Sequence, residues 1–379
     1  MKKVYIIALH LAFGGIEKAV CSMANLFADK YDVRIVAVYN MPDSPAFPLD
    51  ERVKVCYLLE DTPNREEWKS ALKGLRPAVL ARESARSLRI LREKKQCVIG
   101  AIRSIDRGVV ITTRHEDNLL LSQYGSPQVL KIAQIHQDHK FEKTFVDGFK
   151  NGYGNIDVLT MLTPGLAEEA RELMYGCNSH TRVEYVPNFL EHYPESVWLD
   201  GRDKTVLAVG RLNAVKRFEL LIESFAAVHA QAPDWQLRIV GEGEERGKLQ
   251  KLIAKLSAES YVTLVGRLDS AGVEREMLRA SFFAMSSASE GFPFVLLEAQ
   301  SCGLPVLAYD VRVGPGFVVK NGLNGYLVGN LDRDMFCRRL LELMGSPELR
   351  RGMGENALKR VGDFSRERVR DIWYSIIGD

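Results

Sequence analysis

Two carboxylates, Glu290 and Glu298, stand on either side of a predicted helix start in the second half of the sequence. Gly291 and Pro293 predict a turn after a strand, and residues 295–300 predict the beginning of a helix. Glu290 then lies in the turn beside free backbone N–H groups, and Glu298 lies farther along the helix. Each carboxylate can accept hydrogen bonds from two groups at once, which suits the paired hydroxyls of a sugar. An acidic helix cap followed by a surface glutamate would give the same two residues.

Two turns that contain glycine carry groups that suit a phosphate. Gly15 precedes a predicted helix, where a backbone N–H with no Cβ in the way can approach an anion at the helix N-terminus. Arg211 follows Gly210 and is followed by Lys216, so a guanidinium that can hold diphosphate oxygens bidentately is joined by a point charge. The alternatives are a tight turn that uses glycine for its geometry and two solvated cations at a helix start.

Histidines stand at the ends of two predicted strands in the first half of the sequence. His136 follows the predicted strand 132–135, and His115 follows the predicted strand 109–112. Parallel sheets bind ligands beyond the carboxyl ends of their strands, so both side chains are expected near a binding cleft. A lone histidine is more often structural, and His136 is the stronger candidate.

Composition limits the classes of protein that the sequence can encode. A net charge of +2 over 379 residues argues against a nucleic-acid binder. The six cysteines contain no Cys-x-x-Cys pair, which argues against a zinc site and a disulfide scaffold and predicts a reducing, cytoplasmic compartment. The apolar run near the first residue is short and meets two glycines, so it predicts a buried strand rather than a signal peptide. No run reaches the ~18 apolar residues that a membrane span needs.

The elements that must position these groups follow an α/β rhythm. Short β-branched runs alternate with helix-length amphipathic patterns, which predicts parallel sheets covered by helices on both faces. A polar stretch with Pro194 and Gly201 separates two such halves. The first domain is therefore expected at residues 1–197 and the second at 198–365, with a final helix from residue 366 to 379.

The joint pattern resembles that of the family 4 retaining glycosyltransferases. The run from Glu290 to Val306 is similar to the E-x7-E signature of that family, and Gly314-Pro315 and residues 321–328 are similar to its following elements. The turns at Gly15 and Gly210 match in the same order along the chain. The resemblance implies the GT-B fold, two facing Rossmann-like domains with a cleft between them, in which the last helix packs back on the first domain.

The resemblance also implies a role for each matching residue. Glu298 would hold the ribose of a nucleotide-sugar donor, Glu290 would contact the donor sugar, and Arg211 and Lys216 would neutralise the diphosphate. His136, Glu290, Arg211 and Lys216 would be the catalytic set. The other donor-binding positions would be Gly15, Arg267, Leu268, Gly291, Phe292, Pro293 and Phe294, with sugar specificity expected from Phe292, Phe294 and the loop 311–315. His115, Glu116 and His139 are the candidates for acceptor contacts.

The implied reaction is metal-independent transfer with retention of configuration, with no cofactor and no metal. The diphosphate leaves, and an acceptor hydroxyl attacks from the same face. The partners would be a nucleotide-sugar, most simply a UDP-sugar that carries a hexose or N-acetylhexosamine, and a glycan or lipid-linked acceptor. Bacterial surface polysaccharide or glycolipid synthesis is the expected setting.

A basic stretch in the first half suggests where such a protein could meet a membrane. Residues 65–107 hold twelve Lys and Arg against five Asp and Glu, and Arg82, Arg86 and Arg89 share one helix face. A basic amphipathic helix suits the anionic headgroups at the inner face of a membrane. A solvated helix face would show the same pattern.

Other functions on the same scaffold remain open at this stage. A non-catalytic nucleotide-sugar binding protein, a nucleotide-sugar epimerase and a phosphorylase would share the fold, although no cofactor lysine for a phosphorylase is evident. A nicotinamide dehydrogenase is disfavoured, because Arg246 stands where the turn at Gly241 would need the third glycine of the dinucleotide fingerprint.

Overall fold

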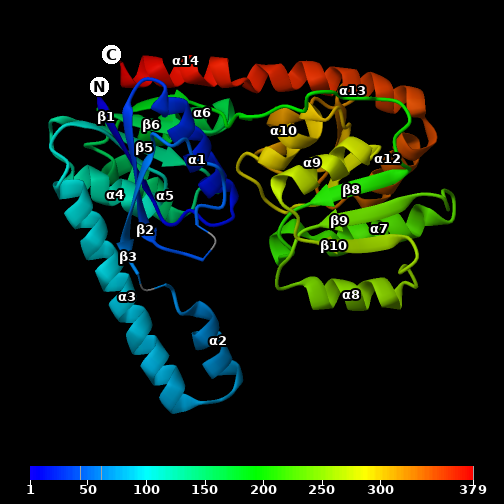
Figure 1. The fold of residues 1–379 in the computed structure, drawn as a ribbon, viewed down its shortest axis with the longest axis horizontal. Coiled ribbons are helices and arrows are strands. Elements are labelled where there is room, and N and C mark those ends of the chain that lie inside the picture. The colour runs from blue at the N-terminus through cyan, green and yellow to red at the C-terminus, as the bar shows by residue number, and fades with distance from the viewer. Residues whose placement is uncertain (43, 61, 379) are drawn as a thin grey trace. The chain divides into compact units, whose positions relative to one another are not determined.

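The computed structural model describes residues 1–42, 44–60 and 62–378. The chain divides into two compact units, of which unit 1 comprises Met1–Val186 with Arg370–Asp379 and unit 2 comprises Pro187–Val369. Each unit is a Rossmann-like α/β domain built on a parallel sheet (Figure 1), so the expected fold class is confirmed.

Unit 1 contains, in its described residues, a parallel sheet of seven strands in the order β3-β2-β1-β4-β5-β6-β7. The inner strands are buried on both faces, as their apolar runs require. The strand order reverses between β1 and β4, which is where open α/β sheets bind their ligands. The strands are β1 (Lys3–Ala8), β2 (Asp32–Tyr39), β3 (Lys54–Leu59), β4 (Gly108–Thr112), β5 (Val129–Ile135), β6 (Val158–Met161) and β7 (Arg182–Tyr185).

Helices connect these strands, and the loops at the carboxyl ends of the strands form the candidate site. The helices are α1 (Gly15–Ala28), α2 (Arg65–Lys73), α3 (Pro77–Arg103), α4 (His115–Tyr124), α5 (Lys143–Asp147) and α6 (Pro164–Met174), with a π-helical turn at Gly148–Gly152. Pro164 at the first position of α6 and the hydroxyl of Thr163, which accepts a hydrogen bond from the Leu166 N–H, show why that helix begins there.

Unit 2 repeats the plan with a parallel sheet of six strands in its described residues, in the order β10-β9-β8-β11-β12-β13. Here the order reverses between β8 and β11. The elements are β8 (Thr205–Val209), α7 (Phe218–His229), β9 (Gln236–Val240), α8 (Arg246–Lys255), β10 (Val262–Gly266), α9 (Ser270–Arg279), β11 (Phe282–Met285), α10 (Phe294–Ser301), β12 (Val306–Asp310), α11 (Pro315–Val318), β13 (Gly325–Gly329), α12 (Arg333–Gly345) and α13 (Pro347–Val361), with 3-10 turns at Ala214–Lys216 and Gly362–Phe364.

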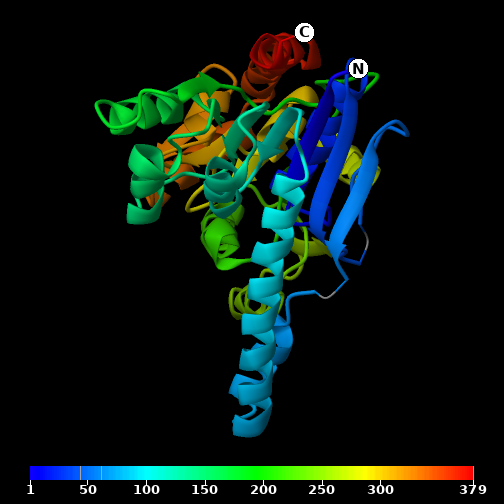
Figure 2. The same cartoon turned by 90° about the vertical axis from the view of Figure 1, so that its left-hand side faces the viewer.

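The basic stretch forms a helical hairpin of α2 and α3 that extends away from the sheet of unit 1 (Figure 2). A polar network joins its two arms. The Asn64 side chain donates to both the carbonyl and the carboxylate of Glu83 at 2.9 Å, and the Trp68 indole donates to the Ser84 hydroxyl at 3.0 Å. Among the described helices, none is both long and apolar enough to cross a membrane.

The division between the units lies at Pro187, earlier in the chain than the expected change at residue 198. Arg202 explains why the polar stretch belongs to unit 2. Its guanidinium donates hydrogen bonds to the carbonyls of Trp198, Met277, Ala280 and Cys302. These bonds bind the stretch to the ends of α9 and α10.

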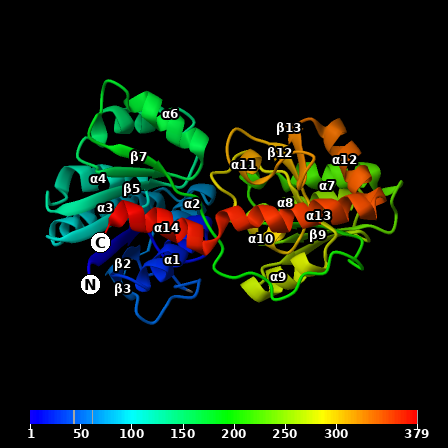
Figure 3. The same cartoon turned by 90° about the horizontal axis from the view of Figure 1, so that it is seen from above.

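The last helix, α14 (Arg366–Ile377), ends within unit 1 (Figure 3). Trp373 is 2% exposed and packs edge-on against Phe27 of α1, with ring centroids 5.3 Å apart. The Lys2 ammonium donates to the Ile377 carbonyl at 2.7 Å, and the Tyr31 hydroxyl donates to the Gly378 carbonyl at 3.0 Å. The expected helix 366–379 also included Asp379, which lies outside the described residues.

Candidate functional site

Lys216 and Glu290 meet at the point in unit 2 where the strand order reverses. Lys216 follows β8, Glu290 follows β11, and the Lys216 ammonium donates to the Glu290 carboxylate at 2.6 Å. Their side chains are 22% and 12% exposed, so the ion pair is largely shielded from water. The Ser286 hydroxyl donates to the Lys216 carbonyl at 2.8 Å and fixes the two loops to each other. The structure therefore brings together two residues that the sequence separates by a whole β-α-β series.

Glycines let the loops after β8 and β9 lie against each other. A Cβ at Gly241 would stand 1.9 Å from the Gly210 carbonyl oxygen, and one at Gly243 would stand 2.3 Å from that of Leu212. Both distances are far below a permitted contact, so only glycine fits. Backbone hydrogen bonds from Gly210 to Val240 and from Leu212 to Glu242 continue the strand pairing into the turns. The glycines at 241 and 243 thus have a packing role.

Gly314 closes the other side of the Glu290 turn. Its φ of +98° is in the left-handed region, and a Cβ there would lie 3.0 Å from the Glu290 Cβ and 3.1 Å from the Gly291 carbonyl oxygen. The loop before α11 is thereby held directly against Glu290.

The Phe292 side chain, for which a role in sugar specificity was expected, is buried in unit 2. It is 5% exposed and packs against Phe317 and Phe364, with ring centroids 6.0 Å and 5.5 Å away. Its carbonyl accepts a hydrogen bond from the Asn188 side chain at 3.4 Å. Phe294 is 8% exposed. Both side chains are therefore largely buried, and their role in sugar specificity stays a prediction.

Arg211 lies at the surface of unit 2. Its side chain is 71% exposed, and its guanidinium stands 3.6 Å from the Glu244 carboxylate. An exposed pair of this kind is worth little and is easily exchanged for another anion. Glu298 is half-buried on α10, and Arg267 and Leu268 follow β10 at the same edge of the sheet as the Lys216 loop.

Arg217 is a structural residue of this site that the sequence did not single out. It has a left-handed φ of 47° at the start of α7. Its guanidinium donates to the carbonyls of Ser286 and Ser287 and to the side chain of Asn330. The next residue after Lys216 therefore anchors the loop that leads to Glu290. No local sequence pattern marks it, because its partners are all distant along the chain.

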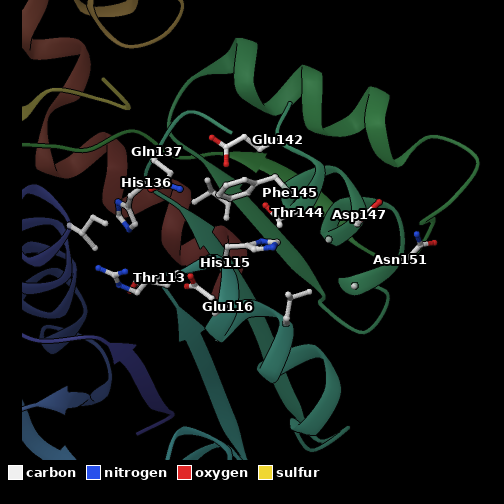
Figure 4. Close-up of a pocket in the computed structure, with 16 residues that line it drawn as sticks. Thr113, His115, Glu116, His136, Gln137, Glu142, Thr144, Phe145, Asp147 and Asn151 are labelled. Atoms are coloured by element: carbon white, nitrogen blue, oxygen red, sulfur yellow. The ribbon is translucent and has the colours of Figure 1, made fainter. Parts of the chain in front are cut away.

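Unit 1 contains a cavity of about 1060 Å³ beyond the carboxyl ends of β4 and β5 (Figure 4). His115 lies at its centre in the close-up, with Thr113 and His136 on one side and Asp147 and Asn151 on the other. The lining also includes Ile16, Arg114, Glu116, Leu119, Ile135, Gln137, Glu142, Thr144, Phe145, Gly148 and Gly152. His115, Glu116 and His136, predicted separately from the sequence, thus line one cavity.

His136 is held as a neutral imidazole. Burial, together with the positive charge of Arg114, lowers the pKa of His136 to about 4. Its Nε2 lies 2.9 Å from the side-chain oxygen of Gln134, which places the ring proton on Nε2 and leaves Nδ1 as an acceptor. Such a group can accept a hydrogen bond from a sugar hydroxyl at neutral pH.

His115 forms a hydrogen-bonded pair with Tyr153. Its Nδ1 is 2.6 Å from the Tyr153 hydroxyl, and burial lowers the pKa of His115 below its usual value. Burial also raises the pKa of the Tyr153 hydroxyl, so Tyr153 stays protonated and can donate to the imidazole. Glu116, the next residue, is exposed and lines the cavity.

His139 does not fit the acceptor role that was expected. Its side chain is fully buried and stands 2.9 Å from the Glu169 carboxylate, while its Nδ1 accepts a hydrogen bond from the Phe141 N–H at 3.1 Å. The ring packs edge-on against Phe141 and Phe149. Since it has no access to the cavity, its position indicates a structural role.

Gly15 is not packed against other backbone, in contrast to Gly241 and Gly243 of unit 2. It is exposed at the first position of α1, and a Cβ placed on it meets no described atom within 4 Å. Neither packing nor backbone conformation therefore requires glycine there. No side chain of the cap bonds this helix N-terminus, and the Glu17 carboxylate lies against Gly14 beside it. A helix N-terminus is suited to a phosphate. Within the described ranges, no three or more His, Cys, Asp or Glu side chains gather as a metal site would require.

Comparison with known protein families gives one match. Residues 191–360, which lie entirely within unit 2, match the family described as glycosyl transferases group 1. The matched range contains Arg211, Lys216, Glu290 and Glu298.

Two relatives extend this similarity. The chain is 28% identical, over 98% of its length, to 40% of an exopolysaccharide phosphotransferase of Streptomyces coelicolor. It is 33% identical, over 46% of its length, to 48% of an amylovoran biosynthesis glycosyltransferase of Erwinia amylovora. The chain thus spans less than half the length of either relative.

Among solved structures, TarM from S. aureus has the same fold. It superposes with a TM-score of 0.80 at 15% identity and covers 100% of both chains. The superposition shows that the two units together have the GT-B fold, and the family match adds that unit 2 is similar to the group 1 glycosyl transferases.

Proposed function

We propose that this protein is a retaining glycosyltransferase that moves a hexose or N-acetylhexosamine from a UDP-sugar to a hydroxyl of a glycan or lipid-linked acceptor. The observation that carries the proposal is the Lys216–Glu290 pair where the strand order of unit 2 reverses. It combines a cation for a diphosphate with a carboxylate for sugar hydroxyls, at the place where this type of sheet binds nucleotides.

Unit 2 would bind the donor. Lys216, assisted by Arg211, would neutralise the diphosphate, and Glu290 would exchange its bond to Lys216 for hydroxyls of the sugar. The backbone at residues 291–294 would support the sugar, Glu298 would hold the ribose, and the backbone at Arg267 and Leu268 would meet the base. The exposed Arg211 is free to move, since its bond to Glu244 is weak.

Unit 1 would supply His136 and the Gly15 turn. The neutral imidazole would accept a hydrogen bond from the donor sugar, and the open N-terminus of α1 would add N–H donors for phosphate. In the transfer step, the bond between the anomeric carbon and the diphosphate oxygen breaks and the electron pair leaves with the diphosphate. The acceptor oxygen bonds to that carbon from the same face, and its proton passes to the departing phosphate. Charge stabilisation by Lys216 and Arg211 is the main catalytic effect, without a metal or cofactor in the proposed mechanism.

The choice of donor and setting rests on similar proteins. The S. aureus TarM structure contains UDP, and the Erwinia amylovora relative acts in amylovoran biosynthesis. By analogy, the donor would be a UDP-sugar and the product a surface polysaccharide or glycolipid. The reaction would take place in the cytoplasm, at the inner face of the membrane.

The proposal is tested by offering UDP-, GDP- and ADP-sugars and measuring both donor binding by calorimetry and release of nucleoside diphosphate. We expect one UDP-sugar to bind and to be turned over, and E290Q to lower turnover by about 100-fold, the scale of losing one well-placed polar contact to developing charge. E259Q is the matched control, because Glu259 is an exposed glutamate of the same unit. The proposal is wrong if no nucleotide-sugar binds, or if E259Q and E290Q lose turnover equally.

A further inference from the structure

We propose that the cavity of unit 1 binds a negatively charged group of the acceptor, a phosphate or carboxylate, and that the guanidinium of Arg114 is its receptor. That the ligand is the acceptor rests on the proposed function, whereas the anion site itself rests on unit 1 alone.

Arg114 is a half-buried cation whose guanidinium has no ion pair or hydrogen bond among the residues that the structure describes. Its Nε is buried and lacks a hydrogen-bond partner. A buried donor on a charged group costs free energy unless something accepts its bond. By contrast, Lys216, a half-buried cation of the other unit, is paired with Glu290 at 2.6 Å.

The position of Arg114 in the fold is that of a binding residue. It follows β4, next to the point where the strand order of unit 1 reverses, and lines the cavity. It is also the N-cap of α4, a ten-residue helix whose N-terminus no side chain of the cap satisfies. The free N–H groups of that first turn reinforce the attraction of an anion.

The groups around Arg114 do not neutralise it. Two imidazoles feel its charge, His10 after β1 and His136 after β5, and the pKa of each is lowered, chiefly by burial. Burial thus favours the neutral form of each ring. Asp117 also feels the charge of Arg114, but neither of its carboxylate oxygens has a hydrogen-bond partner.

The acidic residues of the cavity indicate how a ligand would lie. Glu116, Glu142 and Asp147 line it and are exposed. In Figure 4, Asp147 lies across His115 from Thr113 and His136. An anion would therefore occupy the Arg114 end, and the carboxylates would accept hydrogen bonds from uncharged hydroxyls. This arrangement fits an acidic or phosphorylated polyol or sugar.

The test uses the full chain and two pairs of probes: glycerol 3-phosphate against glycerol, and glucuronate against glucose. Binding is followed by NMR of the histidine ring protons, with wild type, R114Q, R114K and R107Q. Arg107 is the matched control, because it is an exposed arginine at the opposite end of β4. Thermal unfolding of each variant checks that it is folded.

We expect one or both anionic probes to bind, the neutral ones to bind at least tenfold more weakly, and R114Q to abolish the difference. R114K should keep part of it, because charge remains while the bidentate geometry is lost. R107Q should match wild type. Binding of the anion should raise the pKa of His136, as should R114Q without ligand, because each removes the unbalanced charge beside the ring. Preference for one anion identifies the group as phosphate or carboxylate.

Equal binding of anionic and neutral probes, or unchanged anion binding in R114Q, overturns the proposal. Loss of UDP binding in R114Q would assign Arg114 to the donor and overturn it as well. If no nucleotide-sugar binds to the wild type but the anion still binds at Arg114, the glycosyltransferase proposal fails and the anion site stands.

Discussion

Two half-buried cations distinguish the strand ends of the two units. Lys216 is paired with Glu290 at 2.6 Å, so a donor must exchange with a bond that already exists. Arg114 has no such pair among the described residues, so an anion there would add a bond without breaking one. The paired Lys216 therefore favours selectivity for the correct donor, and the unpaired Arg114 favours affinity for an anion.

The ionised carboxylate of Asp117 is expected to destabilise the folded protein. Both carboxylate oxygens are buried without a hydrogen-bond partner, and burial raises the pKa of Asp117 above its usual value. The folded-state pKa of Asp117 is therefore higher than its unfolded-state pKa of about 3.9. The contribution of protonated Asp117 to the free energy of unfolding is fully present below the unfolded-state pKa and is lost as the pH rises through the folded-state pKa.

We therefore expect D117N to be more stable than wild type at neutral pH, by about 1–3 kcal/mol, the cost of a buried polar group left unsatisfied. The difference should vanish as the pH falls below 4, roughly the unfolded-state value. Urea unfolding between acidic and neutral pH measures it, with D106N, which alters an exposed carboxylate, as the control. An equal or lower stability of D117N at neutral pH would contradict the interpretation.

Single residues were predictable from the sequence only where their role is local. The turn motifs located Lys216 and Glu290, and the strand ends located His115 and His136. Arg202, Arg217 and the free guanidinium of Arg114 were missed, because their surroundings come from segments distant along the chain. The burial of His139 was missed for the same reason, because Glu169, which lies 2.9 Å from its imidazole, is remote in sequence.

At the scale of elements, the parallel sheets followed from apolar runs, but the extent of the helices did not. The sequence placed one helix face at Arg82, Arg86 and Arg89, whereas α3 runs from Pro77 to Arg103. Its later part is held by burial of Val98 and Ile102, four residues apart on one face. The preceding α2 was not predicted. It is polar on average, and the side chains of Asn64 and Trp68 bond it to α3.

The α2–α3 hairpin carries the prediction of membrane contact. Leu88 and Leu91 are 65% and 59% exposed, and Arg89 and Arg92 beside them are exposed as well. Exposed leucines among cations suit anionic headgroups. Each cation near such a surface contributes about 1 kcal/mol, so R89Q/R92Q should weaken binding to anionic vesicles by about 30-fold at low salt.

Co-sedimentation with anionic and neutral vesicles measures this effect. The matched control is K251Q/K255Q, which removes two exposed cations from α8 of the other unit. Equally weak binding of the wild type to both kinds of vesicle would exclude the membrane contact.

At the scale of the whole molecule, unit 1 is assembled from two separate stretches of chain. W373A should destabilise unit 1 by about 3–5 kcal/mol, because loss of the buried indole that packs against Phe27 would leave a cavity. W198A changes a side chain that is 77% exposed and should cost less than ~0.5 kcal/mol. Hydrogen exchange of α1 after each substitution reports the effect, and equal protection in the two variants would contradict it.

This division of unit 1 has a consequence for the order of synthesis. Domains generally begin to fold as they emerge from the ribosome, N-terminal part first. The surface of α1 at Phe27 and Tyr31 is covered by Trp373 and Tyr374, which are translated only after all of unit 2. During translation, nascent unit 1 therefore exposes an aromatic surface for as long as the ribosome takes to complete unit 2. That interval is when a chaperone would be needed most, and a translational pause within unit 2 would lengthen it.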